Sequence, residues 1–130
     1  MSSLPEQMRE RTKKFALRIV KLFRFLPRSA EAQVMGKQLL RSGTSVAANY
    51  RAVCRARSSA QFLAKMGIVI EEADETVFWL ELLVESVIAR AKQMDKLFQE
   101  ANELLAIFAA SAQTARRKYV RAQAGPSMTQ

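Results

Sequence analysis

The sequence predicts an all-α protein, an up-down-up-down bundle of four helices. Three observations support this prediction. Glycine and proline are scarce, with four and three residues, so long stretches contain no turn signal. Apolar residues recur at intervals of three and four along most of the chain, which is the period of a helix buried on one face. The length of 130 residues suits one domain in which all helices share a core.

The first two helices are expected over about residues 6–26 and 30–57. The apolar stripe of the first comprises Met8, Thr12, Phe15, Ile19, Leu22 and Leu26. Pro27 ends this helix because its ring disfavours helical geometry in the preceding residue. The seam of the second comprises Met35, Leu39, Gly43, Val46, Tyr50 and Val53. It crosses a run of small residues, 42–49, for which a strand or loop is the rival interpretation. We favour a helix because the apolar residues on both sides stay in phase.

The last two helices are expected over about residues 59–89 and 95–119. Ser58 and Gln61 match a capping box at the start of the third helix. Its seam comprises Phe62, Met66, Val69, Ala73, Thr76, Leu80, Leu83 and Val87. The fourth helix buries Leu97 or Phe98, Ala101, Leu104, Leu105, Phe108, Ala112 and Ala115. The link between them, residues 90–94, contains no Gly or Pro to mark the turn. The bundle is expected to span residues 1–122, followed by a disordered tail, 123–130.

Residue usage argues against catalysis. The chain has one cysteine, Cys54, and no histidine, so neither a Ser-His-Asp nor a Cys-His arrangement can be built. We therefore expect a protein that is not an enzyme and that uses no cofactor or metal. The first residues lack the apolar core of a signal peptide. The longest apolar run, 104–112, is too short to span a bilayer, so we expect a cytoplasmic location.

The net charge of +9 is unevenly distributed. Residues 1–58 carry a net charge of +10, residues 59–90 carry −4 and residues 91–130 carry +3. Basic residues follow rows on the first two predicted helices, and closely spaced cations attract phosphates without reading sequence. The alternative is an ordinary solvated face. We expect RNA or DNA to bind through Arg11, Lys14, Arg18, Lys21, Arg41, Arg51 and Arg55. Cations near the end of the fourth helix, at 116–118 and 121, suit the helix dipole or extend this surface.

The third predicted helix carries an acidic face between residues 71 and 85. A hard-cation site made of carboxylates is one interpretation. We favour ion pairing with the basic helices of this chain or of a second copy, which makes a homo-oligomer plausible. Polar residues within the apolar rows are expected to form a structural or oligomer network comprising Ser42, Asn49, Glu72, Glu75 and Trp79. A catalytic carboxylate pair is the alternative reading of the acidic members. For Trp79 the alternative is an aromatic platform that stacks on bases.

A set of short motifs is spread over about residues 8–119. It comprises Phe15-Ala16, Leu26-Pro27, the run from Gln38 to Asn49, Ser58, Phe62, Lys65-Met66, Ile68, Glu72-Ala73, Glu75-Thr76 and Trp79-Leu80. In these motifs the sequence resembles a bacterial four-helix-bundle family, the proteins encoded in intervening sequences of 23S rRNA genes. That family includes the accessory variability determinant protein of diversity-generating retroelements. Gly43 departs from the Ala that relatives often carry.

The resemblance implies a four-helix bundle that assembles into a homopentameric ring. In the retroelement members it associates the basic surface with nucleic acid and with a reverse transcriptase. We therefore expect a non-enzymatic, oligomeric adaptor that binds nucleic acid through the first two helices. The alternative is a structural homo-oligomer or protein-interaction module for which nucleic acid has no physiological role.

Overall fold

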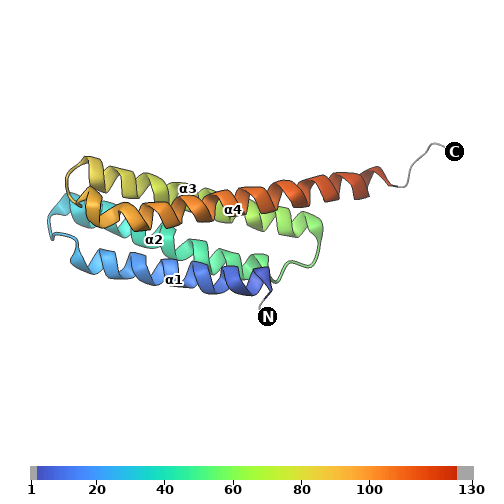
Figure 1. Ribbon diagram of the computed structural model, residues 1–130, viewed down its shortest axis with the longest axis horizontal. Helices are drawn as coiled ribbons and strands as arrows, with labels where there is room; N and C mark the ends of the chain where they lie inside the picture. The colour runs from blue at the N-terminus through green and yellow to red at the C-terminus, as the bar shows by residue number, and fades with distance from the viewer. Residues whose placement is uncertain (1–2, 126–130) are drawn as a thin grey trace.

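The computed structural model describes residues 3–125 and confirms the all-α four-helix bundle. The helices are α1 (Leu4–Phe25), α2 (Ala30–Val53), α3 (Ser59–Glu85) and α4 (Ala91–Ala124). Consecutive helices run antiparallel, and the last turns of α4 project past the other three (Figure 1). No helix in the part of the chain that the structure describes is long and apolar enough to cross a bilayer.

The core is built from the apolar stripes of all four helices. Its largest fully buried side chains include Phe15, Ile19, Leu39, Met66, Leu80, Leu83, Met94, Leu104 and Phe108. The ring of Tyr50 on α2 stacks on that of Phe108 on α4, with the ring centroids 5.7 Å apart. Among neighbouring helices, α1 and α4 share the fewest contacts, so the bundle is least tightly closed along that side.

The run of small residues at 42–49 is helical throughout, as predicted. Gly43 is buried in this run and faces α1. A Cβ atom at this position would lie 2.8 Å from Cγ1 of Ile19, whose side chain is fully buried. The absence of a side chain therefore allows α1 and α2 to pack closely at this crossing.

Several helix ends differ from those predicted. The second helix ends at Val53 rather than 57, and the third at Glu85 rather than 89. The fourth helix begins at Ala91 rather than 95 and continues to Ala124 rather than 119. Two residues of the predicted tail, 123 and 124, are therefore helical, and the part of that tail from 126 to 130 lies outside the described residues.

The start of α3 follows the predicted cap in part. Ser58 is the N-cap, and its hydroxyl accepts a hydrogen bond from the backbone N–H of Gln61 at 3.0 Å. The Gln61 side chain accepts from the backbone N–H of Arg57 at 2.6 Å, one residue before the partner of a regular capping box. Both side chains nevertheless satisfy donors at the helix start, which fixes where α3 begins.

A Schellman motif ends α3. The N–H of Ile88 donates to the carbonyl of Leu83 and that of Val87 to the carbonyl of Val84, both at 3.0 Å. This arrangement requires a left-handed residue, normally Gly, but Val87 occupies the position with φ of 62°. The sequence gives no sign of this turn, because Val normally avoids such a conformation.

Replacing Val87 with Gly is expected to stabilise the fold by about 1 kcal/mol, because a left-handed conformation strains a side chain with a Cβ atom. Val87 is 86% exposed, so its removal sacrifices little packing. Chemical denaturation would measure the change in unfolding free energy. Val87→Ala is the control: it retains the Cβ atom and should gain less. Equal stabilities for the Gly variant and the parent protein would argue against strain at this turn.

Candidate functional site

An open groove of about 950 Å³ lies over α1 and the C-terminal half of α2. Its lining comprises Glu6, Gln7, Arg9, Glu10, Arg11, Lys13, Lys14, Ala47, Ala48 and Arg51. Ala47 and Ala48 are small, and long side chains surround them. Five of the lining side chains are basic and two are acidic, so the groove has a positive net charge. We call it the basic groove.

The predicted basic residues do not all belong to the basic groove. Lys14 and Arg51 line it, whereas Arg18, Lys21 and Arg55 are exposed outside its lining. Lys14 lies 3.9 Å from a carboxylate oxygen of Glu10, one turn away on α1. Both side chains of that pair are largely exposed, so the contact contributes little and leaves the ammonium accessible.

Arg11 is tied to α4. Its Nε donates to Glu100 at 2.8 Å, and its Nη2 donates to Glu100 at 2.6 Å and to Glu103 at 3.1 Å. Two carboxylates therefore already surround this guanidinium. The contact connects α1 and α4 where few other contacts exist, which gives Arg11 a structural role.

Arg9 and Lys13 are groove residues absent from the predicted set. Both are exposed, and no ion pair joins either of them to another residue between 3 and 125. They are four residues apart on α1, so the spacing was visible in the sequence. The sequence did not show which side of α1 lies next to α2. The apolar stripe shows which face of a helix is buried, but not which helix lies on either side of that face.

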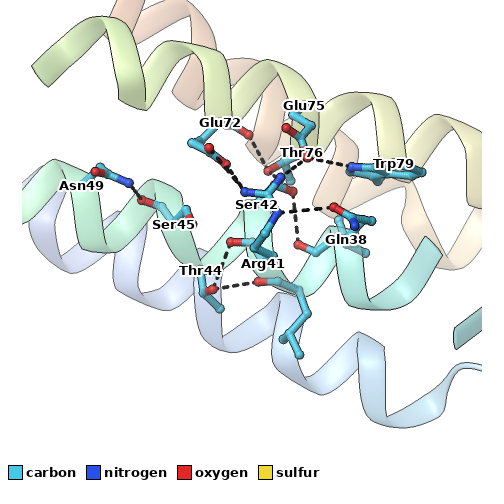
Figure 2. A network of polar contacts seen from close by, with 12 residues as sticks. Gln38, Arg41, Ser42, Thr44, Ser45, Asn49, Glu72, Glu75, Thr76 and Trp79 are labelled. Atoms are coloured by element: carbon cyan, nitrogen blue, oxygen red, sulfur yellow. Dashed lines mark hydrogen bonds and ion pairs between the residues drawn. The ribbon is translucent and has the colours of Figure 1, made fainter. Parts of the chain in front are cut away.

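Arg41 is the centre of a polar network between α2 and α3 (Figure 2). Its Nη1 lies 3.1 Å from Oε2 of Glu72, and its Nη2 pairs with Glu75. The indole Nε1 of Trp79 donates to the same Glu75 at 3.0 Å. The network thus holds Arg41 against α3, and its charge is balanced by two carboxylates of its own chain.

Two buried hydroxyls extend the network inward. The Oγ atom of Ser42 and the Oγ1 atom of Thr76 lie 3.0 Å apart, and both residues are fully buried. Thr76 also reaches the carbonyl of Glu72 at 2.7 Å. No buried side-chain nitrogen or oxygen in the described part of the chain lacks a hydrogen-bond partner. Asn49 lies outside the network, because its amide donates to the carbonyl of Ser45 in its own helix at 2.9 Å (Figure 2).

The network changes the acidity of Glu75. The hydrogen bond from Trp79, followed by that from Arg41, lowers the pKa of Glu75 below its ordinary value, although partial desolvation opposes the change. A carboxyl whose pKa is lower in the folded state stabilises the fold above its unfolded-state pKa. That contribution is lost as the pH falls through the folded-state pKa.

Glu75→Gln is expected to reduce the unfolding free energy by about 1 kcal/mol at neutral pH, because it removes the charge that Arg41 and Trp79 both contact. The difference from the parent protein should shrink as the pH falls through the lowered folded-state pKa of Glu75, because the parent then also carries a neutral side chain at this position. Urea titrations at several pH values would measure this. The matched control is Glu71→Gln, at an exposed position on α3. A difference at Glu75 that persists unchanged at acid pH would contradict this explanation.

The outer face of α3 retains the remaining acidic residues. Its exposed carboxylates are Glu71, Asp74, Glu81 and Glu85. The apolar side chains of Ile68 and Phe78 are 45% and 50% exposed, and the ring of Phe78 meets Trp79 edge-on. No group of three His, Cys, Asp or Glu residues within 3–125 is arranged to hold a metal ion. This face is therefore acidic and partly apolar, in contrast to the groove.

The family model of the 23S rRNA-intervening sequence protein matches residues 6–110. The chain belongs to this family. The resemblance inferred from the sequence is confirmed at the level of the 23S rRNA intervening-sequence family. A solved member of the S23 ribosomal protein family from Bacteroides thetaiotaomicron, described as a protein with unknown function, is 35% identical. The similarity covers 84% of this chain and 97% of that one, with a TM-score of 0.78. No curated protein matches the chain.

Proposed function

We propose that this family member is a non-enzymatic nucleic-acid-binding adaptor that contacts RNA or DNA through the basic groove. The observation that supports this most is the set of uncompensated cations on two packed helices. Arg9, Lys13 and Arg51 line one groove, and no carboxylate within residues 3–125 forms an ion pair with them. Fixed cations of this kind release counterions when they meet phosphates, which favours binding without base recognition.

Arg11 and Arg41 each form ion pairs with glutamates of the same chain, and this reduces the number of cations available to contact phosphates. Each is already neutralised by two carboxylates, so a phosphate would have to displace charge-assisted hydrogen bonds. The proposed contacts are therefore Arg9, Lys13, Lys14 and Arg51. Arg18, Lys21 and Arg55 add to the positive field nearby.

The test is a triple variant of the groove, Arg9→Ala/Lys13→Ala/Arg51→Ala. Its affinity for a random-sequence DNA duplex of about 24 base pairs should fall at least about tenfold at 0.1 M salt, and the slope of log K against log salt should decrease by about 3. Fluorescence anisotropy would measure both quantities. The matched control is Arg90→Ala/Lys92→Ala/Lys96→Ala, which removes the same charge from exposed positions at the start of α4. Equal losses in both variants would show that net charge, rather than the groove, drives binding.

A structural homo-oligomer is the second candidate, and the outer face of α3 favours it. This face combines exposed carboxylates with Ile68 and Phe78, and the groove of another copy would supply the complementary charge. Light scattering at low and high salt would detect such association. A salt-sensitive oligomer whose mass is unaffected by nucleic acid, together with no binding of the duplex, would support this second function.

A further inference from the structure

The C-terminal part of α4 leaves the bundle. The helix has 34 residues, and its last buried residue is Ala112. The last turns of α4 project past the neighbouring helices, at the same end of the molecule as the start of α1 (Figure 1). We call residues 113–124 the arm. Only Ala115 and Tyr119 are half-buried within it, and the other arm residues are exposed, so packing against the bundle contributes little to the arm.

The arm is strongly cationic. Its charged residues are Arg116, Arg117, Lys118 and Arg121. No acidic residue follows Glu103 in the sequence, and no ion pair involves an arm residue in the part of the chain that the structure describes. Like charges four residues apart, such as Arg117 and Arg121, repel each other on a helix. The negative end of the helix dipole offsets some of this repulsion, and a bound polyanion would remove the rest.

The arm and the basic groove both border the first turns of α1. A second, mainly apolar groove of about 540 Å³ is lined by Leu4 of α1, by Phe62 of α3 and by residues of α4, with Lys118 of the arm as its one charged lining residue. Two residues further along α1, Glu6 begins the lining of the basic groove. A single extended polyanion passing over the start of α1 therefore encounters cations on both sides.

Neither cationic element offers an exposed aromatic ring. Tyr50 is buried and stacks on Phe108, Tyr119 is half-buried in the arm, and the half-buried Phe62 lines the second groove. The exposed rings, Phe25 and Phe78, lie at the end of α1 remote from the arm and on the acidic face of α3. Proteins that bind single strands combine cations with aromatic side chains on which bases stack. A cationic surface without an exposed aromatic ring suits a duplex, whose bases are already stacked and whose phosphates lie outside.

We propose that the arm is a second cationic binding element that, together with the basic groove, holds the phosphate backbone of a double-stranded nucleic acid. This inference rests on the proposed nucleic-acid-binding function and specifies its ligand. The arm is about 18 Å long at the rise of an α-helix. It is therefore long enough to lie against several phosphates of a duplex, which carries one phosphate charge per about 1.7 Å of its axis.

The experiment compares the parent protein with the groove variant and with an arm variant, Arg117→Ala/Lys118→Ala/Arg121→Ala. Each binds a random-sequence DNA duplex of about 24 base pairs or one of its separated strands at about 0.1 M salt. We expect the parent to bind the duplex at least about fivefold more tightly than the strand. The arm variant should lose about tenfold in duplex affinity, and its salt slope should decrease by about 3. The triple variant at Arg90, Lys92 and Lys96 is the control for net charge.

The outcomes separate the two proposals. An arm variant that binds the duplex like the parent, or a parent that prefers the single strand, overturns the inference, while a loss in the groove variant keeps the proposed function. A groove variant that binds as well as the parent overturns the proposed function and the inference with it. The arm variant should have a thermal unfolding midpoint close to that of the parent, because the three substituted side chains are exposed. A loss of affinity is then a loss of contacts.

Discussion

Replacing Phe108 with Ala is expected to destabilise the protein by about 4 kcal/mol, the largest effect of any substitution considered. The Phe108 side chain is fully buried and projects from α4 across the core to stack on Tyr50 of α2. No other ring stacks on it within residues 3–125. Its loss removes apolar burial and leaves a cavity that packed neighbours fill only in part. Urea unfolding monitored by circular dichroism would measure the change.

Phe25→Ala is the matched control for Phe108→Ala. Phe25 ends α1 and is 78% exposed, so the same truncation should change the unfolding free energy by less than about 0.5 kcal/mol. Similar losses for the two variants would mean that the centre of the bundle is not packed as described.

Gly43→Leu is expected to destabilise the fold by about 3 kcal/mol, the second largest effect. The first atom added at Gly43 already meets Cγ1 of Ile19 at 2.8 Å, with Cγ2 and Cβ of the same residue at 3.0 and 3.2 Å. These atoms lie near the base of a fully buried side chain, so a rotamer change cannot clear them. The helices α1 and α2 must therefore move apart, which opens the core beside the crossing.

The same substitution at Gly67 is expected to stabilise the fold rather than destabilise it. Gly67 lies inside α3, and a Cβ atom there would meet nothing within 4 Å among the described residues. Gly67→Leu should therefore gain about 0.8 kcal/mol from helix propensity. Equilibrium unfolding of both variants tests the pair. If Gly43→Leu were as stable as the parent, the close crossing of α1 and α2 would be wrong.

The architecture was predictable because the apolar residues keep a helical period through every element. Even the small residues at 42–49 kept the phase between Leu39 and Tyr50, and Pro27 marks the first turn. The turn between α3 and α4 was less predictable. Val87 occupies the left-handed position where Gly is usual, so the predicted third helix ran too far. The predicted fourth helix also ended too early, at residue 119. The apolar stripe ends at Ala115, although the helix continues to Ala124.

The charged residues were predicted less well than the helices, for a physical reason. A row of cations on one helix shows that they share a face, but not what lies opposite. Arg11 meets Glu100 and Glu103 across about ninety residues of sequence separation, a contact that periodicity cannot detect. The pairing of Arg41 with Glu72 and Glu75 is similar, although here the two polar clusters in neighbouring helices did suggest a network.

The resulting molecule has two contrasting sides. One side carries the basic groove on α1 and α2, and the other carries carboxylates with Ile68 and Phe78 on α3. Electrostatic potentials of opposite sign on two sides of a protein steer a charged partner toward one side and repel it from the other. A polyanion is therefore expected to approach α1 and α2 first, and its affinity is expected to fall steeply with salt.

Lysine footprinting tests the basic groove most directly, because lysines occur both inside and far from it. The protein would be treated with an acylating reagent with and without the random-sequence duplex, and modification would be read by mass spectrometry. Bound nucleic acid should protect Lys13 and Lys14, which line the groove, and leave Lys92 and Lys96 at the start of α4 reactive. Protection of Lys92 and Lys96 with Lys13 and Lys14 left reactive would contradict the assignment of the groove.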